Sequence, residues 1–125
     1  MDTKLYDNPL KVELKGEELF VNDQKHSKSQ RSIKEIVNTL MEKAEGGLDQ
    51  TLYFMYRDVY KKSDIRFDIT LIPANSINKE CVKTHGHYHP KSEDGLAYPE
   101  LYQILRGKCT FILQKKNKRD DFGCL

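Results

Sequence analysis

The alternation of apolar and polar residues predicts a chain built mainly of β-strands. Apolar residues occupy every second position from Leu10 to Leu14, and a second short apolar run covers 19–21. Two longer segments, 51–60 and 65–73, are rich in Tyr, Phe, Ile, Leu and Thr and are separated by a short polar turn. Runs of this kind with turn residues between them are typical of antiparallel strands.

Three further strands are predicted in the second half of the chain. The segment 79–89 is followed by a polar loop, and 101–106 and 108–114 are expected to form a pair that turns at Gly107. Short strands at this spacing are typical of an antiparallel barrel or sandwich. We therefore expect a mainly β fold.

One segment, about 32–45, has the periodicity of a helix instead. Ser32 followed by Glu35 matches a capping box, and Gly46 with Gly47 is expected to end the helix. The apolar residues that would form its buried stripe are Ile33, Ile36, Val37, Leu40, Met41 and Ala44.

The composition indicates a globular protein of one domain. The chain has 125 residues, and its net charge of +2 is too small to predict a nucleic-acid partner. It contains no run of about 20 apolar residues, which a membrane-spanning helix would need. Its first residues lack the apolar region of a signal peptide, so we expect a cytoplasmic protein without a membrane partner.

The candidate chemistry lies in a histidine-rich segment, 84–90. His87 and His89 alternate and would point to the same face of a strand, as two chelating imidazoles do. Glu100 opens the next expected strand, so an antiparallel turn would bring its carboxylate beside them and complete a metal-binding face. His85 shares the parity of the pair, which leaves the ligand count open. A histidine cluster on a solvated loop is the alternative that spacing alone does not exclude.

The motif around these residues resembles a known protein family. The run Thr84-x-Gly86-His87-x-His89, then a polar loop and Glu100-x-Tyr102-x-x-Leu105-x-Gly107, is similar to the first motif of cupin proteins. Within the cupins it resembles archaeal-type glucose-6-phosphate isomerases, and the likeness extends over about 8–115. The resemblance implies one cupin domain over 1–125, a jelly-roll antiparallel barrel with one N-terminal α-helix, and a first cupin motif at 84–107.

The resemblance also implies roles for individual residues. The metal ligands would be His87, His89 and Glu100, and they would hold one divalent ion, iron in the first place, with zinc, manganese or nickel as alternatives. Glu100 is also the candidate catalytic base, although metal ligation would lower its basicity. The substrate-binding residues of the family correspond to Thr70, Thr84, Gly86 and Tyr102.

The implied reaction interconverts glucose 6-phosphate and fructose 6-phosphate, a step of glycolysis and gluconeogenesis. Two alternatives stay open: another cupin enzyme such as an iron dioxygenase, and an inactive fragment that binds metal or sugar. Family members carry a fourth ligand, a histidine in a second motif, whereas the last histidine here is His89. We therefore expect a chain truncated at its C-terminal side, with a barrel that is incomplete there. A homodimer is a further expectation, from analogy with other cupins.

Overall fold

The computed structural model describes residues 2–114, and the expectations for the end of the chain lie outside this range. The chain divides between Thr84 and His85 into two compact units, which are described in turn. No helix within 2–114 has the length and apolar character that crossing a membrane requires.

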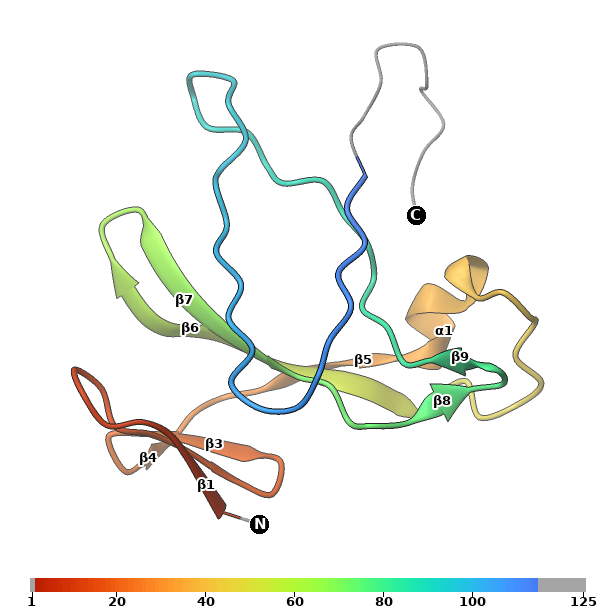
Figure 1. Ribbon diagram of the computed structural model, residues 1–125, viewed down its shortest axis with the longest axis horizontal. Coiled ribbons are helices and arrows are strands. Elements are labelled where there is room, and N and C mark those ends of the chain that lie inside the picture. The colour runs from red at the N-terminus through yellow and green to blue at the C-terminus, as the bar shows by residue number, and fades with distance from the viewer. Residues whose placement is uncertain (1, 115–125) are drawn as a thin grey trace. The chain divides into compact units, whose positions relative to one another are not determined.

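The first unit consists of short antiparallel strands and one short helix. Its strands form a four-stranded sheet in the order β1-β2-β3-β4, a three-stranded sheet β5-β6-β7 and a two-stranded hairpin β8-β9 (Figure 1). The elements are β1 (Asp2–Tyr6), β2 (Val12–Lys15), β3 (Glu18–Val21), β4 (Gln24–Lys25), β5 (Ser29–Ser32), α1 (Ile33–Ile36), the 3-10 turn η1 (Val37–Thr39), β6 (Thr51–Lys62), β7 (Ile65–Leu71), β8 (Ser76–Ile77) and β9 (Glu80–Cys81).

The strands expected in the first half of the chain are confirmed. β2 pairs with β3 across a turn at Gly16, whose φ of 61° lies in the left-handed region that glycine adopts without strain. The two longest predicted strands correspond to β6 and β7, which pair from Phe54↔Leu71 to Lys62↔Ile65. The prediction of a mainly β, antiparallel chain is therefore correct.

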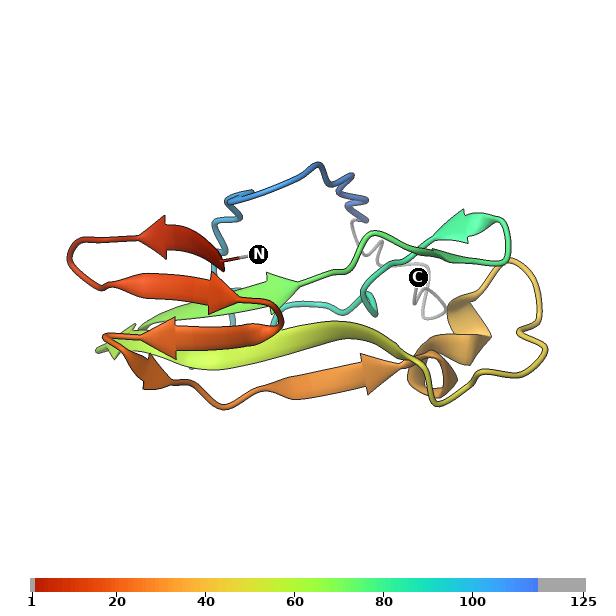
Figure 2. The same ribbon diagram turned by 90° about the horizontal axis from the view of Figure 1, so that it is seen from below.

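Residues of β6 contribute to two separate hydrophobic cores. Figures 1 and 2 show the four-stranded sheet lying against one end of the β6–β7 hairpin, with α1 and the β8–β9 hairpin at the other. The buried residues of the first core are Val12, Leu14, Leu19, Phe54, Tyr56 and Val59. Those of the second are Ile33, Ile36, Leu52, Tyr53, Met55 and Ile77. Burying each large apolar side chain contributes about 1.5–3 kcal/mol, so these two cores hold the unit together.

A bulge interrupts the pairing of β6 with β7 and is held by Asp68. The register shifts between Tyr56 and Tyr60, and Asp58 within the bulge has a φ of 53°. Asp68 accepts a hydrogen bond from the Asp58 N–H at 2.8 Å and another from Arg57 at 2.9 Å. Burial opposes ionisation of Asp68, but these bonds outweigh it, so the pKa of its carboxyl lies below the ordinary 3.8.

The helix is much shorter than the predicted 32–45. The capping box of Ser32 and Glu35 is present, and the Ser32 N–H donates to the Glu35 carboxylate at 2.8 Å. The α-helix nevertheless ends at Ile36, and after η1 the chain is extended at Leu40, with ψ 144°. The glycines expected to end the helix have positive φ but lie in a loop.

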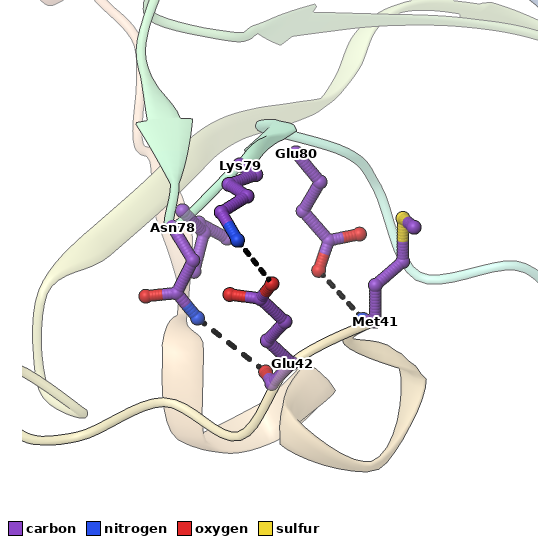
Figure 3. Close-up of a pocket in the computed structure, with 6 residues that line it drawn as sticks. Met41, Glu42, Asn78, Lys79 and Glu80 are labelled. Atoms are coloured by element: carbon purple, nitrogen blue, oxygen red, sulfur yellow. Dashed lines mark hydrogen bonds and ion pairs between the residues drawn. The ribbon is translucent and has the colours of Figure 1, made fainter.

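Contacts with the β8–β9 hairpin explain why the helix stops. The Met41 N–H donates to Glu80 at 2.9 Å, and the Lys79 ammonium lies 3.1 Å from the Glu42 carboxylate (Figure 3). Asn78 donates to the Glu42 carbonyl at 3.4 Å. In a continued helix, the Met41 N–H and the Glu42 carbonyl would bond to other backbone groups of the helix; here they bond to side chains of the hairpin. Met41, predicted to lie in the buried stripe, is 85% exposed.

The second unit contains no helix and no strand within its described residues, 85–114. The predicted strands at 101–106 and 108–114 are therefore wrong for this structure, and of 79–89 only the two residues of β9 are in a strand. A bend does occur at Gly107, with φ 85°. Apolar alternation gives a strand only when a neighbouring strand completes its hydrogen bonds, and an isolated pair is marginal. The described residues form three separate sheets and no closed barrel, so the jelly-roll arrangement stays a prediction.

Candidate metal centre

A small hairpin-like loop, 90–98, brings the candidate ligands of the second unit together. The Tyr98 N–H donates to the Pro90 carbonyl at 3.2 Å, and Lys91 forms an isolated β-bridge with Ala97. Near the tip, the Gly95 N–H donates to the Ser92 carbonyl at 2.9 Å. These bonds return the chain on itself, so the residues before Pro90 face those after Tyr98. The predicted antiparallel return is present, although as a loop between residues that are not in strands.

His89 is oriented by the base of this loop. Its Nδ1 lies 3.2 Å from the Tyr98 carbonyl oxygen, which can only accept a hydrogen bond. A hydrogen bond here requires the proton on Nδ1, and in that neutral tautomer the lone pair is on Nε2. Nε2 lies 3.1 Å from Oε2 of Glu100, so the ring presents its metal-binding nitrogen to the carboxylate.

His87 completes the group. One ligand atom from each of His87, His89 and Glu100 lies within 4.8 Å of the others, a separation that one ion can bridge. The two imidazole rings have centroids 5.8 Å apart and planes inclined by 42°. The sequence predicted that His87 and His89 would share one face of a β-strand. That explanation is wrong, because this segment is not a strand. The three predicted ligands are nevertheless brought together, and His85 is not a member of the group.

Glu100 has a second partner in Tyr102. The Tyr102 hydroxyl donates a hydrogen bond to Oε2, the oxygen that also faces His89. The Tyr102 ring is itself packed against Phe111, with centroids 5.2 Å apart and planes inclined by 55°. The Glu100 carboxylate is thus held by Tyr102, whose ring is in turn packed against Phe111.

The chemistry of this group fits a divalent transition metal. Two imidazoles and one carboxylate bind iron, zinc, nickel and manganese, and three ligands leave positions open for a substrate. In the neutral ring, His89 Nε2 and Glu100 Oε2 direct lone pairs at each other, which a shared proton or a cation would relieve. The side chains of His89 and Glu100 are 32% and 34% exposed, so small molecules have access.

The other predicted site residues are placed in both units. Thr70 lies on β7 opposite Met55, and its side chain is exposed. Thr84 is also exposed and ends the first unit, whereas Gly86 and Tyr102 belong to the second. Within the second unit, the structure places Tyr102 directly beside the metal group. The substrate roles of these four residues stay predictions.

Two interactions of the site were not predicted from the sequence. The Tyr98 carbonyl that orients His89 is a backbone group and leaves no sequence signal. The bond from Tyr102 to Glu100 had a weak signal, because residues two apart in an extended segment share a face.

A small pocket lies elsewhere, between the end of the helical segment and the β8–β9 hairpin. It contains none of the predicted site residues; its lining is formed by Met41, Glu42, Ile77, Asn78, Lys79 and Glu80 (Figure 3). Its charged groups are paired: Lys79 with Glu42 at 3.1 Å and Glu80 with Lys83 at 2.9 Å. We assign it a structural role, since it joins the hairpin to the segment that follows η1.

Comparison with known proteins gives one match. A family model described as glucose-6-phosphate isomerase (GPI) matches residues 24–122 of this chain. The match includes all three residues of the metal group and all four predicted substrate contacts. No curated protein and no solved structure matches the chain.

Proposed function

Because the chain belongs to the glucose-6-phosphate isomerase family of the archaeal cupin type, we propose that it is a metal-dependent isomerase. The proposed reaction interconverts glucose 6-phosphate and fructose 6-phosphate. The observation that supports it is the convergence of His87, His89 and Glu100 within 4.8 Å, inside the segment that the family model matches.

The proposed metal would be held by the two imidazoles and the carboxylate. A bound divalent ion acts as a Lewis acid toward carbonyl and hydroxyl oxygens, which suits a reaction that moves hydrogen between neighbouring sugar carbons. The loop 90–98 contributes orientation, because its backbone fixes which nitrogen of His89 is available. We propose iron first, with zinc, manganese or nickel as other ions of suitable ligand preference.

Glu100 is the proposed base for a proton-transfer route. Its ligand oxygen lies within 4.8 Å of those of the two histidines, and its Oε2 accepts a hydrogen bond from Tyr102 and faces His89. The other oxygen, Oε1, would take the proton from C2 of the open-chain aldose and return it to C1 of the resulting enediol, while the O2 hydroxyl proton passes to O1 to complete the ketose.

The substrate would be bound largely by uncharged donors. The phosphate contacts proposed from the family resemblance are the hydroxyls of Thr70, Thr84 and Tyr102 and the N–H of Gly86, where the absence of a side chain permits close approach. Thr70 and Thr84 are both exposed and accessible to a ligand. We propose a phosphosugar as the ligand class because the matched family acts on one.

The proposal is tested by loading the full chain with iron(II) and following conversion of fructose 6-phosphate with a coupled dehydrogenase assay. Activity in the wild type that is lost in His87→Ala and Glu100→Ala would support the proposal. His26→Gln is the matched control, because His26 lies in the other unit and contacts the Arg57 carbonyl at 2.7 Å. Wild-type protein that binds iron but does not isomerise the sugar would contradict the proposed reaction.

The same donor set supports one alternative, an iron dioxygenase, because two histidines and a carboxylate also form the facial triad of those enzymes. Oxygen consumption with a thiol or phenol, in the absence of the phosphosugar reaction, would favour it. Iron and phosphosugar binding with neither activity would instead indicate an inactive binding protein.

A further inference from the structure

We propose that Gly95 is a positioning residue of the metal site, because the turn that it forms holds His89 and Glu100 together before an ion is bound. This inference rests on the proposed metal site and deepens it, since it assigns a role to a residue outside the three ligands. It is carried by the hydrogen bonds of the loop 90–98 and by the positive φ of Gly95.

The loop 90–98 turns at its tip in a conformation that favours glycine. The Gly95 N–H donates to the Ser92 carbonyl at 2.9 Å, and the Ser92 N–H donates to the Leu96 carbonyl at 2.7 Å. Gly95 itself has a φ of 76°. These features match a three-residue hairpin loop, 93–95, in which a turn is followed by a left-handed residue. Glycine adopts that conformation without strain, whereas it is unfavourable for most residues with a side chain.

Hydrogen bonds connect this turn to the residues that carry the ligand atoms. Behind the turn, an isolated β-bridge and the bond from the Tyr98 N–H to the Pro90 carbonyl keep the two arms of the loop together. His89 directly precedes Pro90. Glu100 follows Tyr98 by two residues, so both ligands leave the loop at its open end. The turn at Gly95 therefore decides which residues meet there.

The closed loop lowers the entropic cost of binding a metal. An ion that bridges His89 and Glu100 must close the intervening segment 90–99, which costs conformational entropy when that segment is open beforehand. Here the segment is already closed by backbone hydrogen bonds, and the ligand atoms of the three residues lie within 4.8 Å of one another. Such preorganisation raises affinity because the ordering takes place on folding and not on binding. A strained turn would move that cost to the binding step while every ligand is still present.

The test compares cobalt(II) binding by four full-length proteins, followed by visible absorption: the wild type, Gly95→Val, Gly95→Asn and Gly46→Val. A β-carbon added at Gly95 meets no atom within 4 Å, so the valine acts through the backbone conformation, which is unfavourable for a β-branched residue. Asparagine tolerates the left-handed region. Gly46 is the matched control, because it has a φ of 90°, equally open surroundings and a position in the first unit.

We expect Gly95→Val to bind cobalt roughly 5- to 30-fold more weakly than the wild type, which corresponds to the cost of a left-handed residue with a side chain. Gly95→Asn should recover most of this loss, and Gly46→Val should match the wild type. At saturating cobalt all four spectra should coincide, because the ligands are unchanged. Wild-type affinity in Gly95→Val would overturn the inference. Equal weakening by Gly95→Asn or by Gly46→Val would also overturn it.

Isomerase activity distinguishes failure of this inference from failure of the proposed reaction. A wild type that binds cobalt and shows the Gly95 effects but does not convert fructose 6-phosphate would contradict the reaction and support the inference. A wild type that converts the sugar, with Gly95→Val binding cobalt as tightly, would contradict the inference and leave the reaction supported.

Discussion

The two units of this chain differ in how they use apolar residues. Residues 2–84 form hydrogen-bonded sheets around two buried cores, whereas 85–114 contain no strand and expose most of their large apolar side chains. Leu19 in the first unit is 0% exposed, and Leu101 in the second is 97% exposed. The candidate metal group nevertheless lies wholly in the second unit.

The first unit contains the buried cores that stabilise the fold, and the second contains the candidate metal ligands. Folding free energy is contributed mainly by buried area, which is concentrated in the first unit. The metal group depends on a few directional contacts of the loop 90–98 and of Tyr102, which bring only a small part of the chain together. Binding segments are commonly drawn from the least stable parts of a protein.

The comparison predicts its largest effect for a matched pair of core and surface substitutions. Leu19→Ala should lower the free energy of unfolding by about 2–5 kcal/mol, because it leaves a cavity in a buried core. Leu101→Ala should change it by no more than about 0.5 kcal/mol. Urea denaturation measures both. Equal losses in the two variants would show that Leu101 is buried in solution and would break the comparison.

A divalent metal should act on the second unit and not on the first. At a concentration about 100 times its dissociation constant, a ligand stabilises the state that binds it by about 2.7 kcal/mol. Amide hydrogen exchange should therefore slow within 85–114 when zinc is added, and change little within 2–84. The His87→Ala variant should lose this protection. Slower exchange in the first unit alone would place the metal elsewhere.

The bulge of β6 should give the first unit a pH dependence of its own. Asp68→Asn should cost about 1.5–3 kcal/mol at pH 7, because bonds to a charged carboxylate are lost. Since the folded-state pKa of Asp68 is lowered, its contribution is fully present above the unfolded-state pKa of about 4 and is lost as pH falls through the folded-state value.

The measurement is the free energy of unfolding of wild type and Asp68→Asn from pH 7 to pH 3. The difference between them should narrow at the acid end. Asp64→Asn, in the turn between β6 and β7, is the control and should show a small difference at all these pH values. A gap that stays constant down to pH 3 would show that the charge of Asp68 is not what stabilises the bulge.

The smallest predicted effect concerns the cap of the short helix. Ser32→Ala should reduce stability by about 0.5–1 kcal/mol, because the Ser32 hydroxyl donates to Glu35 at 3.2 Å. The loss stays small because α1 has only four residues and is held mainly by buried Ile33 and Ile36. Thermal unfolding of the two proteins side by side measures it. A loss as large as that of Leu19→Ala would indicate that the cap supports more than α1.

Several features could be predicted from the sequence because they depend on neighbouring residues. The β6–β7 pair followed from two apolar runs around a polar turn, and the capping box from Ser32 and Glu35. The family was also predicted correctly, because its first motif lies within one short stretch, 84–107. The three candidate ligands were named for the same reason, and the structure brings them together.

The amino-acid sequence by itself determined the mainly β character, the family and the identity of the candidate ligands, since each depends on residue types at short spacing. Only the tertiary structure decided where the helix ends and which apolar segments are strands. The bonds of Met41 and Glu42 to the β8–β9 hairpin hold the segment after the helix in a non-helical conformation, and a strand forms only where a partner completes its hydrogen bonds. Periodicity indicates which face of a segment is apolar, but residues distant in the sequence determine what packs against that face.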